Sequence, residues 1–180
     1  LVGLIRDYRT LLGQGVVARF DPETYSDAVA FARIGEGSLG GKARGLAFMN
    51  SMILKHRLYD KHANVRIMIP RSVVIATDYF DDFIRLNGLK YIISQEFSDE
   101  EILSEFGSST VPAKLERELK AYIQTVRTPL AVRSSSKLED SHYQPFAGIY
   151  STYMIPYVDN GDQMLRLLLK AVKSVYASVY

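Results

Sequence analysis

The chain has 180 residues, of which 47% are hydrophobic and 23% are charged, a composition typical of a globular protein. Its formal net charge of +2 is too small to indicate nucleic-acid binding, and the absence of cysteine excludes disulfides, thiolate zinc sites and cysteine nucleophiles. No apolar run approaches the roughly 20 residues that span a bilayer and no signal-peptide pattern is found, so we expect a cytoplasmic protein that binds neither nucleic acid nor membrane.

The N-terminal part of the chain, residues 1–34, contains no motif that assigns it a role. Scattered apolar positions over 1–15 predict a short helix, and a connector follows at 21–23. The next run, GEGSLGGKARG (35–45), is rich in glycine and carries one lysine and one arginine. Apolar residues follow it at helical spacing, so we expect a glycine loop that leads directly into a helix.

Local signals predict the elements in the middle of the chain. β-Branched residues over 65–77 indicate two short strands separated by Pro70. Three helices are expected after them. Thr77 caps a helix over 78–87 that ends at Gly88, Ser98 opens a capping box for a helix that Gly107 closes, and Pro112 begins a helix with Leu115, Leu119, Tyr122 and Val126 on its inner face.

The last part of the chain predicts two strands and a helix. We expect a buried-type strand at 129–136, a second strand at 148–155 and a helix that starts near Asp162. The apolar spacing of that helix continues to Val179, so we expect the chain to be truncated at residue 180 within a longer protein. The order of the elements predicts an α+β fold with a mixed sheet flanked by helices.

The glycine run fails the test for a P-loop. A Walker A motif would need a glycine at position 36 and a hydroxyl residue after the lysine, whereas the chain has Glu36 and Ala43. The glycines at 35, 37 and 40 do match the dinucleotide spacing G-x-G-x-x-G. However, YSDAVAFARI (25–34) indicates helix or irregular structure, so we expect no strand before the loop and give the match little weight.

Two interpretations of the run remain open. Glycines allow backbone N–H groups to approach a ligand, a helix N-terminus follows, and Lys42 adds a positive charge, which together suit a phosphate. Equally, the glycines can serve tight turns beside a solvent-facing lysine. The run alone does not decide between them.

A second block, AVRSSSKLEDSHYQPFAGIYSTY (131–153), contains groups suited to anion binding. Arg133 ends a strand, three serines supply hydroxyl and backbone donors, and Gly148 allows a ligand to approach the backbone. The alternative is a structural role, in which Arg133 pairs with Glu139 or Asp140 beside a serine turn.

Three ordered motifs, SLGGKARGLAFM, IPRSVVIATDYFDDFI and AVRSSSKLEDSHYQPFAGIYSTYM, resemble the N-terminal nucleotide-binding region of the phosphoenolpyruvate synthase and pyruvate phosphate dikinase family. The resemblance covers residues 35–180 and implies the N-terminal lobe of an ATP-grasp-like domain. It implies that Lys42 and Arg133 clamp the phosphates of ATP as catalytic residues. The other ATP-binding positions that it implies are Gly40, Gly41, Ser134, Ala147, Gly148 and Thr152.

The resemblance also implies a reaction. In that family ATP phosphorylates a histidine on a swivelling domain, which passes the phosphoryl group to pyruvate. The Mg²⁺ ligands, the other half of the ATP-grasp fold and the phosphohistidine domain are then expected downstream in the same polypeptide. No metal ligand is expected in this chain, which alone should bind ATP weakly and be inactive.

Alternatives to this function are the same lobe serving another acceptor, an antibiotic or a glucan, and a non-catalytic regulatory module. The hypothesis of a regulatory module rests on residues 149–151, which are Ile-Tyr-Ser where the family usually has a polar stretch. Lys137, within the serine turn, also differs from the family pattern, which has a small residue there. His142 lies within the nucleotide motif, so we expect an accessory or solvent-facing role for it rather than that of phosphoryl acceptor.

Overall fold

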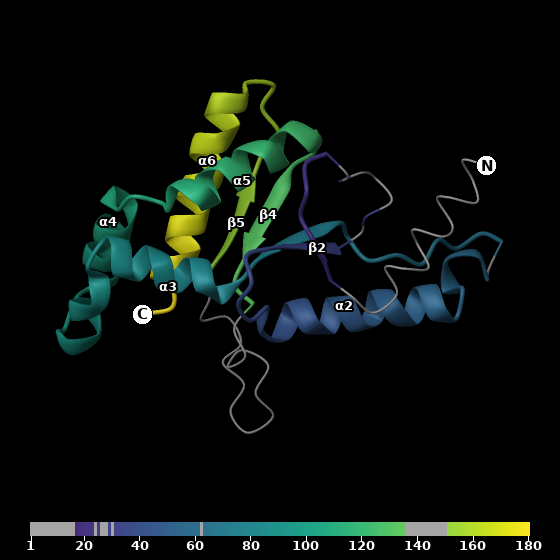
Figure 1. Cartoon of the computed structure of the whole chain (residues 1–180), viewed down its shortest axis with the longest axis horizontal. Coiled ribbons are helices and arrows are strands. Elements are labelled where there is room, and N and C mark those ends of the chain that lie inside the picture. Colours follow the sequence, from purple (N-terminus) through teal and green to yellow (C-terminus); the bar gives the residue numbers. More distant parts are fainter. Residues whose placement is uncertain (1–16, 24, 26–28, 30, 62, 136–150) are drawn as a thin grey trace.

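The chain folds into an α+β structure in which the parallel and antiparallel strands form two separate ladders (Figure 1). The computed structural model describes residues 17–23, 25, 29, 31–61, 63–135 and 151–180. The α+β class predicted from the sequence is confirmed, whereas the helix predicted over 1–15 lies outside the described residues. The elements are β1 (Ala18–Arg19), β2 (Phe31–Ile34), α2 (Gly40–Lys55), η1 (Leu58–Asp60), β3 (Ser72–Ile75), α3 (Thr77–Leu86), η2 (Leu89–Ser94), α4 (Asp99–Ser108), α5 (Ala113–Thr125), β4 (Leu130–Arg133), β5 (Thr152–Ile155) and α6 (Gly161–Ala177).

The first ladder is a parallel sheet in the order β1-β2-β3, with Ala32 of β2 paired to Ala18 of β1 and to Val73 of β3. The expectation that no strand precedes the glycine loop was wrong, because β2 ends at Ile34, directly before Gly35. Central parallel strands are buried on both faces and therefore lack the alternation that marks a strand in a sequence. The loop thus has a strand–loop–helix setting, with α2 forming the crossover from β2 to β3.

The second ladder pairs β4 with β5 antiparallel, and α6 packs on both strands. Among the described residues, the core covers one face of this ladder: Ile155 is buried, and Leu130, Val132 and Tyr153 pack against the core. The strand predicted within 129–136, ahead of the serines, is confirmed as β4, but its residues alternate between partly buried and exposed instead of forming a buried-type strand. The other side, here called the open face, is formed by the exposed residues Ala131, Arg133, Thr152 and Met154.

The main core lies among α3, α4, α5 and α6, to the left and top of Figure 1. Phe83, Phe106, Leu115 and Val172 are almost completely buried there. The predicted inner face of α5 is confirmed, since all four of its residues are buried. The capping box is confirmed too: Ser98 accepts a hydrogen bond from the Glu101 N–H, and the Glu101 carboxylate accepts one from the Ser98 N–H.

Several predicted boundaries differ from the structure. Only one ladder strand, β3, forms within 65–77, because Pro70 has no N–H to donate and the chain joins the ladder only after it. Gly107 lies inside α4 rather than after it, and Val179 lies beyond the end of α6 and is 48% exposed. In the part of the chain that the structure describes, no helix is both long and apolar enough to cross a bilayer.

Candidate functional site

The two motifs that the sequence analysis singled out are in direct contact, although they are about 90 residues apart in the chain. Ser135, just after β4, meets the first turn of α2. The Ser135 carbonyl accepts a hydrogen bond from the Gly41 N–H at 3.0 Å. The Ser135 hydroxyl accepts one from the Ala43 N–H at 2.9 Å and donates one to the Leu39 carbonyl at 2.8 Å. The glycine loop and the VRSS segment therefore form one structural unit.

Gly40 is required by this contact. Its φ of +77° lies in the left-handed region that disfavours side chains, and a Cβ placed on it would lie 1.5 Å from the Ser135 carbonyl oxygen. The backbone of α2 can approach Ser135 only because position 40 lacks a side chain. Gly40 therefore serves first of all to allow contact between the glycine loop and the VRSS segment.

The predicted clamp residues lie on either side of this junction. Lys42 is half-buried and stands between Gly41 and Ala43, both of which are bonded to Ser135. Arg133 is the last residue of β4, lies on the open face and is directly paired with Thr152 of β5. Directly paired residues in an antiparallel ladder have Cβ atoms about 5 Å apart, so the structure brings Arg133 and Thr152 together.

The glycine loop is also held by the start of α3. The Ser38 N–H donates to the Thr77 hydroxyl at 3.0 Å, and the Thr77 N–H donates to the Ser38 carbonyl at 3.0 Å. The Glu36 N–H donates to the Asp78 carboxylate at 2.8 Å. The prediction that Thr77 caps its own helix was wrong: it is the first residue of α3, and its hydroxyl bonds to the loop instead.

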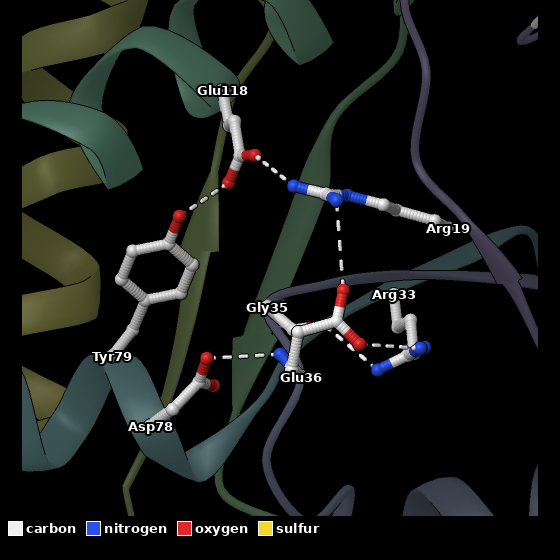
Figure 2. Close-up of polar contacts among 7 residues, drawn as sticks. All are labelled: Arg19, Arg33, Gly35, Glu36, Asp78, Tyr79 and Glu118. Atoms are coloured by element: carbon white, nitrogen blue, oxygen red, sulfur yellow. Dashed lines mark hydrogen bonds and ion pairs between the residues drawn. The ribbon is translucent and has the colours of Figure 1, made fainter.

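A cluster of charged and polar side chains connects the glycine loop to α5, as Figure 2 shows. Glu36 forms ion pairs with Arg33 at 2.7 Å and with Arg19 at 3.6 Å, and Arg19 reaches on to Glu118 of α5 at 3.5 Å. Glu118 accepts a hydrogen bond from the Tyr79 hydroxyl at 2.7 Å. Two arginines thus balance the charge of Glu36, the acid that disqualified the loop as a P-loop.

The titration of the groups around the loop follows from these contacts. Burial of the Asp78 carboxylate opposes its ionisation, but hydrogen bonds from backbone N–H groups, that of Glu36 foremost, outweigh burial and lower the pKa of Asp78. Burial, followed by the bond to Glu118, raises the pKa of Tyr79 well above its ordinary value. Asp78 is therefore ionised and Tyr79 neutral near neutral pH, the states in which both hold their partners.

Part of the predicted site falls outside the described residues. Ala147 and Gly148 lie there, as do Lys137, His142 and the two acids, Glu139 and Asp140, of the alternative interpretation of Arg133. Within the described ranges, no group of three acidic or histidine side chains is placed to hold a metal ion. The side chains at the junction are cationic or carry hydroxyls, which suits phosphate oxygens and does not suit Mg²⁺.

Sequence reasoning missed three residues that shape the site. Ser135 was recognised only as one of three serines with donors for an anion, whereas its hydroxyl and carbonyl bond to α2. Thr77 and Asp78 do lie at the start of α3, but their side chains also hold the loop, a role that the sequence analysis did not give them. Their position inside the matched motifs was the only signal, because bonds between distant segments leave no spacing pattern in a sequence.

Comparison with known proteins identifies one family. The family described as pyruvate phosphate dikinase, AMP/ATP-binding domain, matches residues 36–180, which is more than half of the chain. The match includes both the glycine loop and the VRSS segment. No curated protein and no solved structure matches the chain significantly.

Proposed function

The chain belongs to the family of pyruvate phosphate dikinase AMP/ATP-binding domains, and on that premise we propose that Lys42 and Arg133 together hold the triphosphate of ATP. Such domains serve phosphotransferases, so the site has to bind a highly charged anion and stabilise the charge that develops during transfer. Lys42 supplies a compact ammonium group, and Arg133 supplies a planar guanidinium that can bind phosphate oxygens in pairs.

The contact of Ser135 with Gly41 and Ala43 is the observation that carries this proposal. It places Lys42 next to the segment that bears Arg133, so that two cations from distant parts of the chain can serve one ligand. Thr152, opposite Arg133 on the open face, adds a hydroxyl donor. Gly40 and Gly41 contribute by allowing the backbone of α2 to approach Ser135, which brings Lys42 toward the segment of Arg133. Ser134, between Arg133 and Ser135, completes the proposed contacts.

The chemistry proposed for the clamp is positioning and charge stabilisation. In phosphoryl transfer, negative charge is spread over the oxygens of the transferred group, and fixed cations stabilise it without having to reorganise. The phosphoryl group passes from ATP to a histidine nitrogen, which forms a P–N bond as the P–O bond to the nucleotide breaks. We propose that this histidine then delivers the group to pyruvate.

The rest of the machinery is proposed to lie in other parts of the polypeptide. The exposure of the open face is consistent with a second lobe that would close over the nucleotide. Met154 on this face is 70% exposed beside Arg133 and Thr152, as expected where a nucleotide and a second lobe cover the strands. The described residues at the junction do not suit Mg²⁺, so the proposed carboxylate ligands belong to the downstream half of an ATP-grasp fold. The phosphohistidine domain is proposed to follow as a separate unit.

The test is the loss of histidine phosphorylation in the complete polypeptide that carries this chain. Lys42→Ala and Arg133→Ala should each abolish the transfer of label from radiolabelled ATP to histidine, with the circular dichroism spectrum unchanged. Lys55→Ala, an exposed lysine at the other end of the same helix, is the matched control and should retain activity. Full activity in both clamp variants would remove these residues from the site.

A further inference from the structure

We propose that Ser135 is the residue that positions Lys42 relative to Arg133. The proposal rests on the function proposed above, since it concerns the geometry of that clamp. Ser135 itself is not proposed to touch ATP. Its hydroxyl and its carbonyl are both used within the protein, on the residues that flank Lys42 and on the residue before the helix.

The three hydrogen bonds of Ser135 restrain α2 on both sides of Lys42. The carbonyl binds the N–H of Gly41, the preceding residue, and the hydroxyl binds the N–H of Ala43, the following one. The same hydroxyl donates to Leu39, so it acts as donor and acceptor at once. The backbone at Lys42 can therefore neither slide along the helix axis nor rotate about it without breaking one of these bonds, which fixes the point from which its side chain extends.

Arg133, the other residue of the proposed clamp, is also held in a fixed position. Arg133 lies two residues before Ser135 and is paired with Thr152 in the β4–β5 ladder. The ladder pair holds Arg133 in place, and the path from Arg133 to Lys42 runs through Ser134 to Ser135 and through the hydrogen bonds of Ser135 to α2. Catalytic geometry depends steeply on such distances, because a shift of about 1 Å can cost about a hundredfold in rate.

The carbonyl of Ser135 also replaces a missing cap, because Leu39, at the N-cap position of α2, makes no side-chain capping bond and this carbonyl satisfies the Gly41 N–H in its place. The Ser135 hydroxyl lies between the Ala43 N–H and the Leu39 carbonyl, the i+4 and i partners of the first helical turn, and binds both. If Ser135 had only this structural role, loss of its hydroxyl would destabilise the start of α2 and leave ATP binding and histidine phosphorylation unchanged. The positioning role predicts a kinetic effect in addition, and this difference makes the proposal testable.

The variants to compare are Ser135→Ala, which keeps the backbone bond to Gly41 and loses both hydroxyl bonds, and Ser135→Thr, which keeps the hydroxyl. Ser98→Ala is the matched control, since it removes a serine that caps α4 away from the site. In the complete polypeptide, Ser135→Ala should lower kcat/KM for ATP in histidine phosphorylation by about ten- to a hundredfold. Ser135→Thr should recover most of this loss, and Ser98→Ala should lower the melting temperature alone.

Binding of ATP and of adenosine provides the second readout. Ser135→Ala should weaken ATP and leave adenosine unchanged, and in a Lys42→Ala background its effect on ATP should disappear, since it acts through Lys42. If Ser135→Ala does not fold, Ser135→Cys, similar in size with a weaker donor, is measured instead and should show a smaller loss in the same direction.

The outcomes separate this inference from the proposed function. Normal kcat/KM in Ser135→Ala, or an effect on ATP binding that persists without Lys42, would overturn the positioning role. Should Lys42→Ala and Arg133→Ala be inactive while Ser135→Ala is normal, the clamp stands and only the role of Ser135 falls. Should both clamp variants be fully active, the proposed function itself falls.

Discussion

Replacing Gly40 with alanine tests the junction between the glycine loop and the VRSS segment. The new Cβ would lie 1.5 Å from the carbonyl oxygen of Ser135, where real contacts exceed 3 Å. The obstacle is backbone, so it cannot move aside as a flexible side chain could. Either α2 withdraws from Ser135 or position 40 leaves its φ of +77°.

The expected cost follows from these two strains. Holding a non-glycine residue in the left-handed region costs about 1–2 kcal/mol, and loss of the Gly41–Ser135 hydrogen bond adds about 0.5–1.5 kcal/mol. We therefore expect Gly40→Ala to lower the free energy of unfolding by about 1.5–3.5 kcal/mol. For a chain of this size the melting temperature should fall by about 3–14 °C.

The assay is thermal and urea unfolding of Gly40→Ala beside a control in the same helix. Gly45 lies inside α2, and a Cβ added there would meet nothing within 4 Å, so Gly45→Ala should stabilise the helix by about 0.5–1 kcal/mol. Opposite signs for the two substitutions would support the close contact. A Gly40→Ala variant as stable as the wild type, with unchanged ATP binding, would refute it.

Two further predictions concern the residues that hold the loop. The pKa of Asp78 is lower in the folded chain than its ordinary value of 3.8, so its ionised form stabilises the fold above about pH 4 and this contribution is lost as the pH falls through the folded pKa. In urea unfolding between pH 2 and 6, Asp78→Asn should therefore show a shallower loss of stability with acid than the wild type, and parallel curves would contradict the role of this carboxylate. Tyr79→Phe removes the hydrogen bond to the Glu118 carboxylate, a charged group, and should cost about 1.5–3 kcal/mol in the unfolding free energy at neutral pH. Because the folded pKa of Tyr79 is raised, the wild-type advantage is complete below about pH 10 and lost as the pH rises through the folded pKa, so an advantage that grows above pH 10 would contradict the assignment.

The helices were predictable because their signals are local. The capping box at Ser98 and the proline at 112 mark two helix starts, and the apolar spacing of α5 identifies its buried face. These features depend on residues within one or two turns of each other, so a sequence displays them directly. β2 was missed for the opposite reason: its four residues become a strand through pairing with β1 and β3 on either side.

The same distinction applies to the site. Lys42 and Arg133 were predicted as site residues from motifs, and their segments are in contact in the structure. The residue that makes the contact was not identified, because its hydroxyl bonds reach across 92 and 96 residues of sequence. Thr77 likewise has the chemistry of a helix cap, and only the folded position of Ser38 shows that its hydroxyl binds the loop.

The dependence of binding on phosphate tests the central claim, that Lys42 and Arg133 form one triphosphate clamp. The affinities of ATP and adenosine are measured by calorimetry for the complete polypeptide and for Lys42→Ala, Arg133→Ala and the double variant. Hydrogen bonds to charged groups contribute about 1.5–3 kcal/mol each, so each single variant should bind ATP about ten- to a hundredfold more weakly. Adenosine affinity should stay unchanged, and the double variant should bind ATP little better than adenosine. ATP affinity that is unaltered in the double variant, or a loss that is equal for ATP and adenosine, would contradict the clamp.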